Sequence, residues 1–355
     1  MNSDQYLRKN DQKLDGQNLI KKPVKRDLTR VGVVDIGSNS VRLVVFDGAG
    51  RSPAYFYNEK IMCGLGSGMS ETNCLNPQGR ARAVAALRRF QSLAEGMGIT
   101  PLSAVATAAV REAKDGPDFC QQVERETGLK IWVIDGKQEA RLSAQGVLLG
   151  WPGSYGLVCD IGGSSMELAE ISDGKVGKRQ SSDLGPLKLQ GISGGKKARN
   201  DHIKTTIMAL KDKMGLQQNR LFLVGGSWRA LARVDMERRN YPLHVPHEYR
   251  MSTQGINETI KLLEASDPEK LRRLCHISAN RMALLPIACE VLRRLLITFA
   301  PKDIAISSYG LREGLLFAQM PKKLRDRDPL IEACYFAEAK DARFPGFGKR
   351  LYRFI

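Results

Sequence analysis

Two short stretches of the chain place an aspartate at the end of an apolar run and follow it with glycine and small polar residues. The first covers residues 31–46 and reads VGVVDIGSNSVRLVVF, with Asp35 before the turn. The second covers residues 157–171 and reads LVCDIGGSSMELAEI, with Asp160 before the turn. Glycine lets a backbone approach a ligand closely, and hydroxyl, amide and backbone donors suit phosphate oxygens. Both turns are therefore candidate phosphate-binding loops.

The candidate phosphate ligands are the small residues of these two turns and of a third glycine turn that follows an apolar run at 221–224. They are Gly37, Ser38, Asn39, Ser40, Gly162, Gly163, Ser164, Gly225, Gly226 and Ser227. One such turn alone is equally consistent with an ordinary β-hairpin. Because the strand, aspartate and glycine pattern occurs twice, the sequence favours two similar half-domains that present their loops to one cleft.

Carboxylates beside the turns are candidate metal ligands. Asp160 and Glu167 lie on opposite arms of the second hairpin, so both can approach one divalent ion, and Asp35 ends the equivalent strand of the first hairpin. Mg²⁺ takes one or two carboxylates plus substrate phosphates and keeps several waters. We therefore expect Asp35, Asp160 and Glu167 to position Mg²⁺ or another divalent cation.

Two further residues are candidates for catalysis. Glu139 falls in the first turn of a helix expected after residue 136, where its carboxylate could deprotonate a water aligned with a terminal phosphorus. A glutamate there is also common because it complements the helix dipole. Arg111 follows a short strand at 101–106 and could grip a phosphate bidentately, or form a surface ion pair. From the residues alone, the ordinary role is favoured for both.

The elements that must position these residues predict an α/β protein. Helices are expected at 77–97 and 118–128, further strands at 129–134 and 303–307, and a helix-rich segment from 252 to 298. Residues 174–213 contain ten lysines and arginines interrupted by glycines, which predicts a mobile basic loop that is either solvated or a track for a polyanion. Arg312 and Glu313 could pair with each other or with the cleft, and a structural role is favoured for both.

The charge balance bounds the partners. Lysine and arginine number 55 against 38 aspartates and glutamates, a net charge of +17, which favours a polyanionic partner. Nucleic acid is the less favoured polyanion, because no aromatic stacking motif or recognition helix is present. The seven cysteines form no C-x-x-C pair and the four histidines have no ligand-like partners nearby, which argues against disulfides and structural zinc and for the cytoplasm.

No membrane partner is expected. The most apolar window, residues 282–300, contains Glu290, Arg293 and Arg294, so it predicts a buried amphipathic helix rather than a membrane span. Residues 1–29 are polar and mixed in charge, without the apolar core of a signal peptide. They predict a flexible basic tail with no fold of its own.

Taken together, the motifs resemble the exopolyphosphatase and guanosine pentaphosphate phosphatase (Ppx/GppA) family of the actin, sugar kinase and Hsp70 superfamily. The similar stretches, in the order that family has them, are 35–43, 106–113, 139–142, 160–167, 224–227 and 310–314. The resemblance implies two actin-like (ribonuclease H-like) lobes, at 30–150 and 151–320, with a central interdomain cleft. A tail at 1–29 would precede them, and a basic extension at 321–355 would follow.

The resemblance also implies roles. Glu139 occupies the family position of the general base, Arg111 a position that lines the phosphate site, and Glu167 that of an acidic residue proposed to bind metal or position water. Met166 stands where members commonly carry threonine, so one hydroxyl contact is missing. The third glycine turn, which contacts the nucleoside elsewhere in the superfamily, is expected to face further phosphates here.

The implied function is Mg²⁺-dependent removal of terminal orthophosphate from inorganic polyphosphate. The alternatives are a 5′-phosphatase acting on guanosine pentaphosphate, and a nucleotide- or polyphosphate-binding protein without turnover. A homodimer is one expected assembly.

Overall fold

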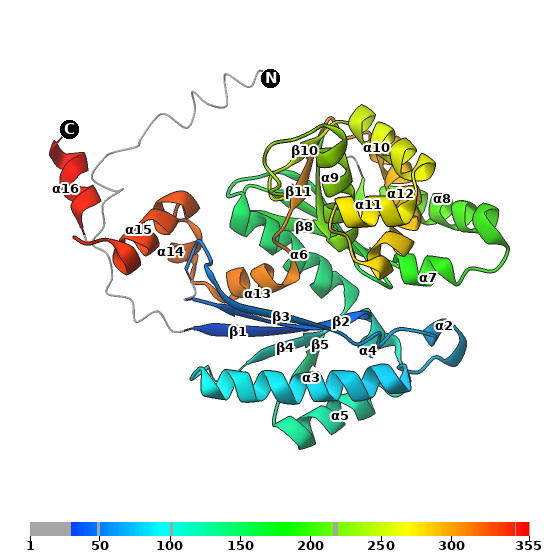
Figure 1. Ribbon diagram of the computed structural model, residues 1–355, viewed down its shortest axis with the longest axis horizontal. Coiled ribbons are helices and arrows are strands. Elements are labelled where there is room, and N and C mark those ends of the chain that lie inside the picture. Colours follow the sequence, from blue (N-terminus) through cyan, green and yellow to red (C-terminus); the bar gives the residue numbers. More distant parts are fainter. Residues whose placement is uncertain (1–29, 48–49, 100–101, 216–218, 345, 355) are drawn as a thin grey trace.

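The computed structural model describes residues 30–354, apart from 48–49, 100–101, 216–218 and 345. The tail predicted at residues 1–29 therefore lies outside the described residues. The described chain forms two β-sheets that follow one another in sequence, each covered by helices on its outer face (Figure 1). We call each sheet with its outer helices a lobe.

The sheet of the first lobe has five strands in the order β3-β2-β1-β4-β5. Strands β1 and β2 form the first hairpin in antiparallel register, and β4 and β5 run parallel to β1. Apolar residues of β1 and β2 point to both faces and are almost all buried, as expected for strands covered on two sides. The strands are β1 Val31–Ile36, β2 Ser40–Phe46, β3 Tyr55–Met62, β4 Ser103–Ala106 and β5 Ile131–Val133.

The second sheet repeats this plan with six strands in the order β10-β11-β9-β6-β7-β8. Strands β6 and β7 form the second hairpin, and β9 lies parallel to β6 as β4 does to β1. The two half-domains expected from the repeated motif therefore share a local topology. The strands are β6 Gly156–Ile161, β7 Met166–Ser172, β8 Lys175–Ser182, β9 Arg220–Gly225, β10 Arg250–Met251 and β11 Asp303–Ser307.

Helices cover the outer face of each sheet. In the first lobe they are α2 Met69–Thr72, α3 Pro77–Gly96, α4 Ala108–Glu112 and α5 Gly116–Thr127. In the second lobe they are α7 Pro186–Gln190, α8 Gly195–Met214, α9 Gly226–Arg238, α10 Thr253–Ala265, α11 Pro268–Leu274 and α12 Ala279–Phe299. The window at 282–300 thus belongs to α12, and within the described residues no helix is long and apolar enough to cross a membrane.

The prediction of a mobile basic loop at 174–213 was wrong. The segment forms β8, α7 and α8, because Ile203, Ile207, Leu210 and Met214 recur at helical spacing and bury one face of α8. Most of its lysines lie on the opposite, solvated face.

Two helices pack against each other between the sheets, α6 Gly136–Gly150 and α13 Leu311–Gln319 (Figure 1). Their buried residues join inner-face residues of both sheets in one apolar cluster. The helices cross with their backbones in contact: a Cβ at Gly314 would lie 1.7 Å from the carbonyl oxygen of Leu142, and one at Gly146 would lie 2.2 Å from that of Gly310. Glycine is therefore required at this crossing.

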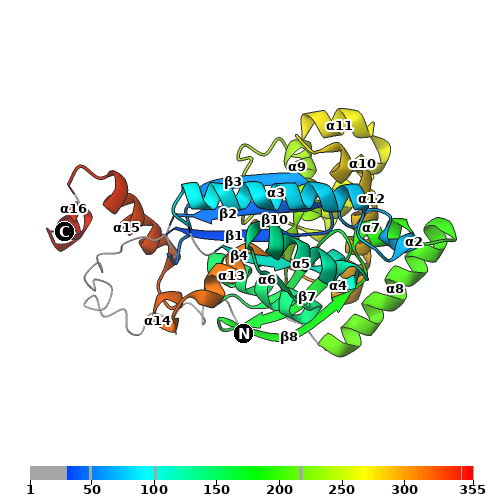
Figure 2. The same ribbon diagram turned by 90° about the horizontal axis from the view of Figure 1, so that it is seen from below.

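The last three helices extend from one end of the molecule, next to the open end of the first sheet (Figure 2). They are α14 Lys322–Arg325, α15 Pro329–Asp341 and α16 Phe347–Phe354. They bury few side chains, so the core of the two lobes ends with α13.

Replacing Gly314 with alanine should therefore loosen the contact between the lobes. We expect Gly314→Ala to lower the free energy of unfolding by about 1–3 kcal/mol or more, because the methyl group has no room beside the Leu142 carbonyl. Urea denaturation measures this. Gly96→Ala is the matched control, since a Cβ at the end of α3 meets nothing within 4 Å, and an equal midpoint for Gly314→Ala and wild type would contradict the expectation.

Candidate functional site

The two glycine and serine turns meet face to face between the lobes. We call residues 37–39 the first loop and residues 162–165 the second loop. Each is closed by the same kind of backbone hydrogen bond, from Gly37 N to Ser40 O at 3.0 Å and from Gly162 N to Ser165 O at 2.9 Å. Between them, the Ser164 hydroxyl donates to the Ser38 hydroxyl at 2.8 Å. The loops thus lie within reach of a single small ligand.

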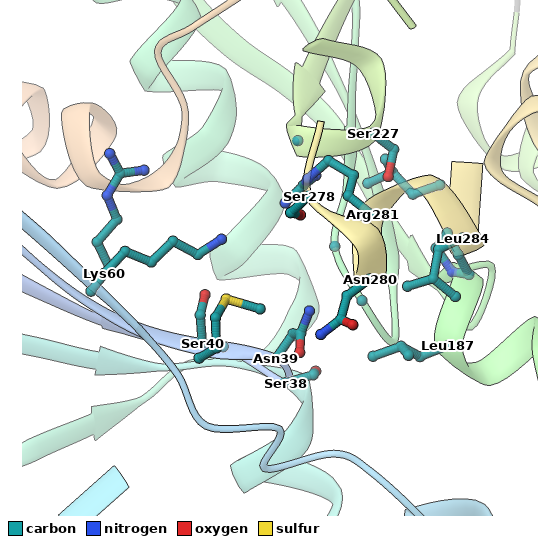
Figure 3. Close-up of a pocket in the computed structure, with 18 of the residues that line it drawn as sticks. Ser38, Asn39, Ser40, Lys60, Leu187, Ser227, Ser278, Asn280, Arg281 and Leu284 are labelled. Carbon is teal, nitrogen blue, oxygen red and sulfur yellow. The ribbon is translucent and has the colours of Figure 1, made fainter. Parts of the chain in front are cut away.

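A cleft of about 210 Å³ opens above the two loops. Figure 3 shows Ser38, Asn39 and Ser40 on its floor, with Lys60 on one side and Arg281 on the other. Of the residues that the sequence marked as phosphate ligands, those that line the cleft are Gly37, Ser38, Asn39, Ser40, Gly162, Gly163, Gly226 and Ser227. Ser164 and Gly225 lie beside it without lining it, Ser164 on Ser38 and Gly225 at the end of β9.

The walls of the cleft are strongly cationic. Five cationic side chains line it and one carboxylate does, so its lining carries a net charge of +4 (five minus one). The cations are Arg42, Lys60, Arg229, Arg281 and Arg312, and the carboxylate is Asp35. Asp35 is already held by Arg312, whose Nη1 lies 3.0 Å from its Oδ2. The other four cations therefore face the cleft without a carboxylate among its lining residues.

This crowding is visible in the proton affinities of the side chains. The pKa of Lys60 is lowered from 10.5 to about 8, first by burial within the cleft walls and then by repulsion from Arg281 and Arg42. Burial and the neighbouring Arg312 and Arg281 lower the pKa of Arg229 to about 10. A bound anion would stabilise the protonated forms of Lys60 and Arg229 and raise their pKa values again. The lowered pKa values therefore favour an anionic ligand in the cleft.

Behind the loops, away from the cleft lining, lies a second group of charges. Glu139 is in the first turn of α6, which is capped by Asp135 and Gln138 in a reciprocal capping box, and only 8% of it is exposed. Burial, and then repulsion from Asp160, raise its pKa from 4.5 to about 8. Arg111 opposes this rise, with Nη1 3.4 Å from Glu139 Oε2.

Asp160 and Glu167 are direct cross-strand partners in the second hairpin. The Ser143 hydroxyl donates to Asp160, and the Ser181 hydroxyl donates to Glu167 Oε1 at 2.9 Å. Burial raises the pKa of both carboxyls, and repulsion from Glu139 raises that of Glu167 further. Three mutually repelling carboxylates are therefore gathered behind the second loop.

The metal set predicted from the sequence is not assembled as expected. Throughout the part of the chain that the structure describes, no group of three or more His, Cys, Asp or Glu side chains could hold a metal ion. Asp35 is paired with Arg312, and it also lies close enough to Asp160 to raise the pKa of that carboxyl. A Mg²⁺ ion still fits the donor chemistry, because it needs only one or two carboxylates beside waters and phosphate oxygens, and its charge would relieve the repulsion between Asp160 and Glu167.

Reasoning from the sequence missed the cationic walls. Arg42 lies two residues after Ser40 on β2, so strand alternation could have placed both on one face. Lys60 is its cross-strand neighbour, which only the register of β3 reveals. Arg312, expected to be structural, is both paired with Asp35 and part of the cleft lining. Arg229 and Arg281 carried no signal in the sequence.

The fold, with its two facing glycine loops, is that of a two-lobed α/β protein. Residues 33–323 match the model of the Ppx/GppA phosphatase family, and the chain belongs to that family.

Among solved structures, the fold is similar to an exopolyphosphatase from Cytophaga hutchinsonii, with a TM-score of 0.73 and 22% identity over 82% of this chain and 97% of that chain. It is also similar to the Aquifex aeolicus Ppx/GppA family member, with a TM-score of 0.69 and 24% identity over 84% of this chain and 99% of that one. These likenesses show the fold.

Curated relatives match over less of their length. Exopolyphosphatase 1 of Mycobacterium tuberculosis is 32% identical over 147 residues, which span 41% of this chain and 43% of that protein. Retrograde regulation protein 2 of Saccharomyces cerevisiae is 24% identical over 340 residues, which span 85% of this chain and 57% of that protein.

The raised pKa of Glu139 predicts how stability depends on pH. Between pH 4.5 and about 8 the folded protein keeps a proton on Glu139 that the unfolded chain releases, so stability falls as the pH rises through this range. We expect Glu139→Gln to reduce this fall and to be more stable than the wild type near pH 8. Urea denaturation at several pH values measures the difference.

The control for that experiment is Glu124→Gln, on the exposed face of α5, which should keep the pH dependence of the wild type. If Glu139→Gln loses stability with rising pH as steeply as the wild type, the raised pKa is refuted.

Proposed function

We propose that the protein is an exopolyphosphatase, which hydrolyses the terminal phosphoanhydride bond of inorganic polyphosphate and releases orthophosphate. The observation that carries the proposal is the cleft with five cations and one carboxylate, which opens directly above the two facing loops. Membership of the Ppx/GppA phosphatase family supports the phosphatase class.

A chain of phosphates fits the arrangement of the cations better than a single phosphate does. Arg42 and Lys60 come from β2 and β3 of the first lobe, whereas Arg229 and Arg281 come from α9 and α12 of the second. Successive phosphates between these walls would each have a cation within reach, and the positive field would draw a polyanion into the cleft.

The chemistry would take place between the loops. The backbone amides and hydroxyls of the first and second loops would bind the terminal phosphoryl group, which must displace the hydrogen bond between Ser164 and Ser38. In its ionised form, Glu139 would take a proton from water, the water oxygen would bond to the terminal phosphorus, and the bridging P–O bond would break to release the shortened chain. Arg111, beside Glu139, would orient that carboxylate and stabilise the negative charge of the phosphoryl group.

A divalent cation fits beside the second hairpin. Asp160 and Glu167 would bind the cation, with substrate oxygens and water as the other ligands. The cation would neutralise the negative charge that develops on the phosphates. Asp35 would instead fix Arg312 in the cleft wall.

The third glycine turn favours phosphates over a nucleoside. The guanidinium of Arg281 lies directly over Gly226, where even a Cβ would approach its Nη1 to 1.7 Å. A base cannot pack on this turn unless Arg281 moves. Guanosine pentaphosphate is thus the second candidate substrate, and its phosphates rather than its base would be recognised here.

Phosphate release from polyphosphates of several lengths tests the proposal. We expect Glu139→Gln to lower the rate by about 10²–10⁴-fold, because general base catalysis contributes that much, while polyphosphate binding survives. Chelation of divalent cations should also lower the rate of the wild type. Glu124→Gln serves as the control with unchanged activity.

A wild type that releases no orthophosphate, or a fully active Glu139→Gln, would contradict the proposal. The same preparation is compared on guanosine pentaphosphate, and a higher kcat/KM on that substrate would replace polyphosphate with the second candidate.

A further inference from the structure

Helix α7 is attached to the second loop. The Leu187 amide donates to the carbonyl oxygen of Gly163 at 2.8 Å. Gly185, which precedes the helix, lies so close that a Cβ there would be 2.2 Å from the carbonyl carbon of Ser164. The helix and the second loop therefore keep their relative position.

From this helix, Lys188 reaches across to the first lobe. Its Nζ lies 3.0 Å from Glu112 Oε2, at the end of α4. The other oxygen of Glu112 lies 3.7 Å from Arg111 Nη2, and Arg111 Nη1 lies 3.4 Å from Glu139 Oε2. Four side chains, alternately basic and acidic, thus lead from the second lobe to the buried glutamate.

Among the described residues, Arg111 has three partners. Its Nη1 donates to the carbonyl oxygen of Ile134 at 2.9 Å on the Glu139 side, and the carboxylates of Glu139 and Glu112 lie at similar distances from Nη1 and Nη2. A further charge can therefore shift the balance between the two carboxylates. Lys188 supplies that charge. It neutralises Glu112 and so weakens the attraction of Glu112 for Arg111. Both members of the Lys188–Glu112 pair are about 40% exposed, at 42% and 39%, so the pair adds little to stability. We expect the Lys188–Glu112 pair instead to influence the position of the Arg111 guanidinium.

We propose that Lys188 is a positioning residue for hydrolysis, which keeps Glu112 from drawing Arg111 away from Glu139. Lys188 touches neither substrate nor reacting water and acts through Glu112 and Arg111. Because α7 is attached to the second loop while Glu112 belongs to the first lobe, the ion pair couples the alignment of Glu139 to the relative position of the two loops. The inference rests on the proposed function.

A double-mutant cycle distinguishes this role from that of a simple brace between the lobes. We expect Lys188→Met to lower kcat on polyphosphate about tenfold with little change in KM, because Glu139 is then misaligned. Glu112→Gln should keep nearly the activity of the wild type, and the double variant should match Glu112→Gln. Lys188→Arg should restore activity, and Lys196→Met, on the exposed face of α8, is the control.

A simple brace predicts that Glu112→Gln is as damaging as Lys188→Met and that the double variant recovers nothing, so that result overturns the inference. If the wild type is active and the cycle fails, the proposed function stands while this inference falls.

A second readout needs no turnover. In a crystal structure of Lys188→Met, Arg111 should leave Glu139 and bond to Glu112. If Arg111 keeps its contact with Glu139 there, the inference is refuted whatever the activity of the wild type.

Discussion

The separation of opposite charges across two glycine loops is the constraint on which this structure depends. Four cations without a carboxylate partner among the lining residues face the cleft on one side, and three mutually repelling carboxylates lie behind the second loop on the other. Neither group stabilises the free protein, since burial and like charges work against both. Such opposed shifts in pKa are typical of sites that bind and activate charged ligands.

A rigid packing arrangement holds the charged groups in place. The crossing of α6 and α13 at glycine contacts joins the inner faces of both sheets in one apolar cluster. Glu139 is in the first turn of α6 and Arg312 is in the first turn of α13, so the same crossing sets the positions of a carboxylate behind the loops and of a cation in the cleft wall. The two loops are thereby positioned by the core, and their own hydrogen bonds only close the turns.

The sequence predicts those parts of the fold that depend on local pattern. Each Asp-Ile-Gly turn follows directly from its apolar strand, so both hairpins, and Glu139 in the first turn of a helix, could be placed from neighbouring residues alone. Lys60 could not, because its place beside Arg42 depends on a strand register set by long-range pairing.

Around 174–213 the glycines and lysines favoured a loop, although the sequence also contains the helical spacing of Ile203, Ile207 and Leu210. Packing of that face against the second lobe stabilises α8. Asp35, expected among the metal ligands, is paired with Arg312, and a contact across 277 positions of the sequence could not be found from neighbouring residues.

The four cleft cations other than Arg312 are proposed to bind a polyanion. Thermal unfolding of the wild type and of the double variant Lys60→Met/Arg281→Met, each with and without inorganic polyphosphate, tests this proposal most directly. We expect the free double variant to be at least as stable as the free wild type, and polyphosphate to raise the unfolding midpoint of the wild type far more than that of the variant. An equal rise in both proteins would contradict it.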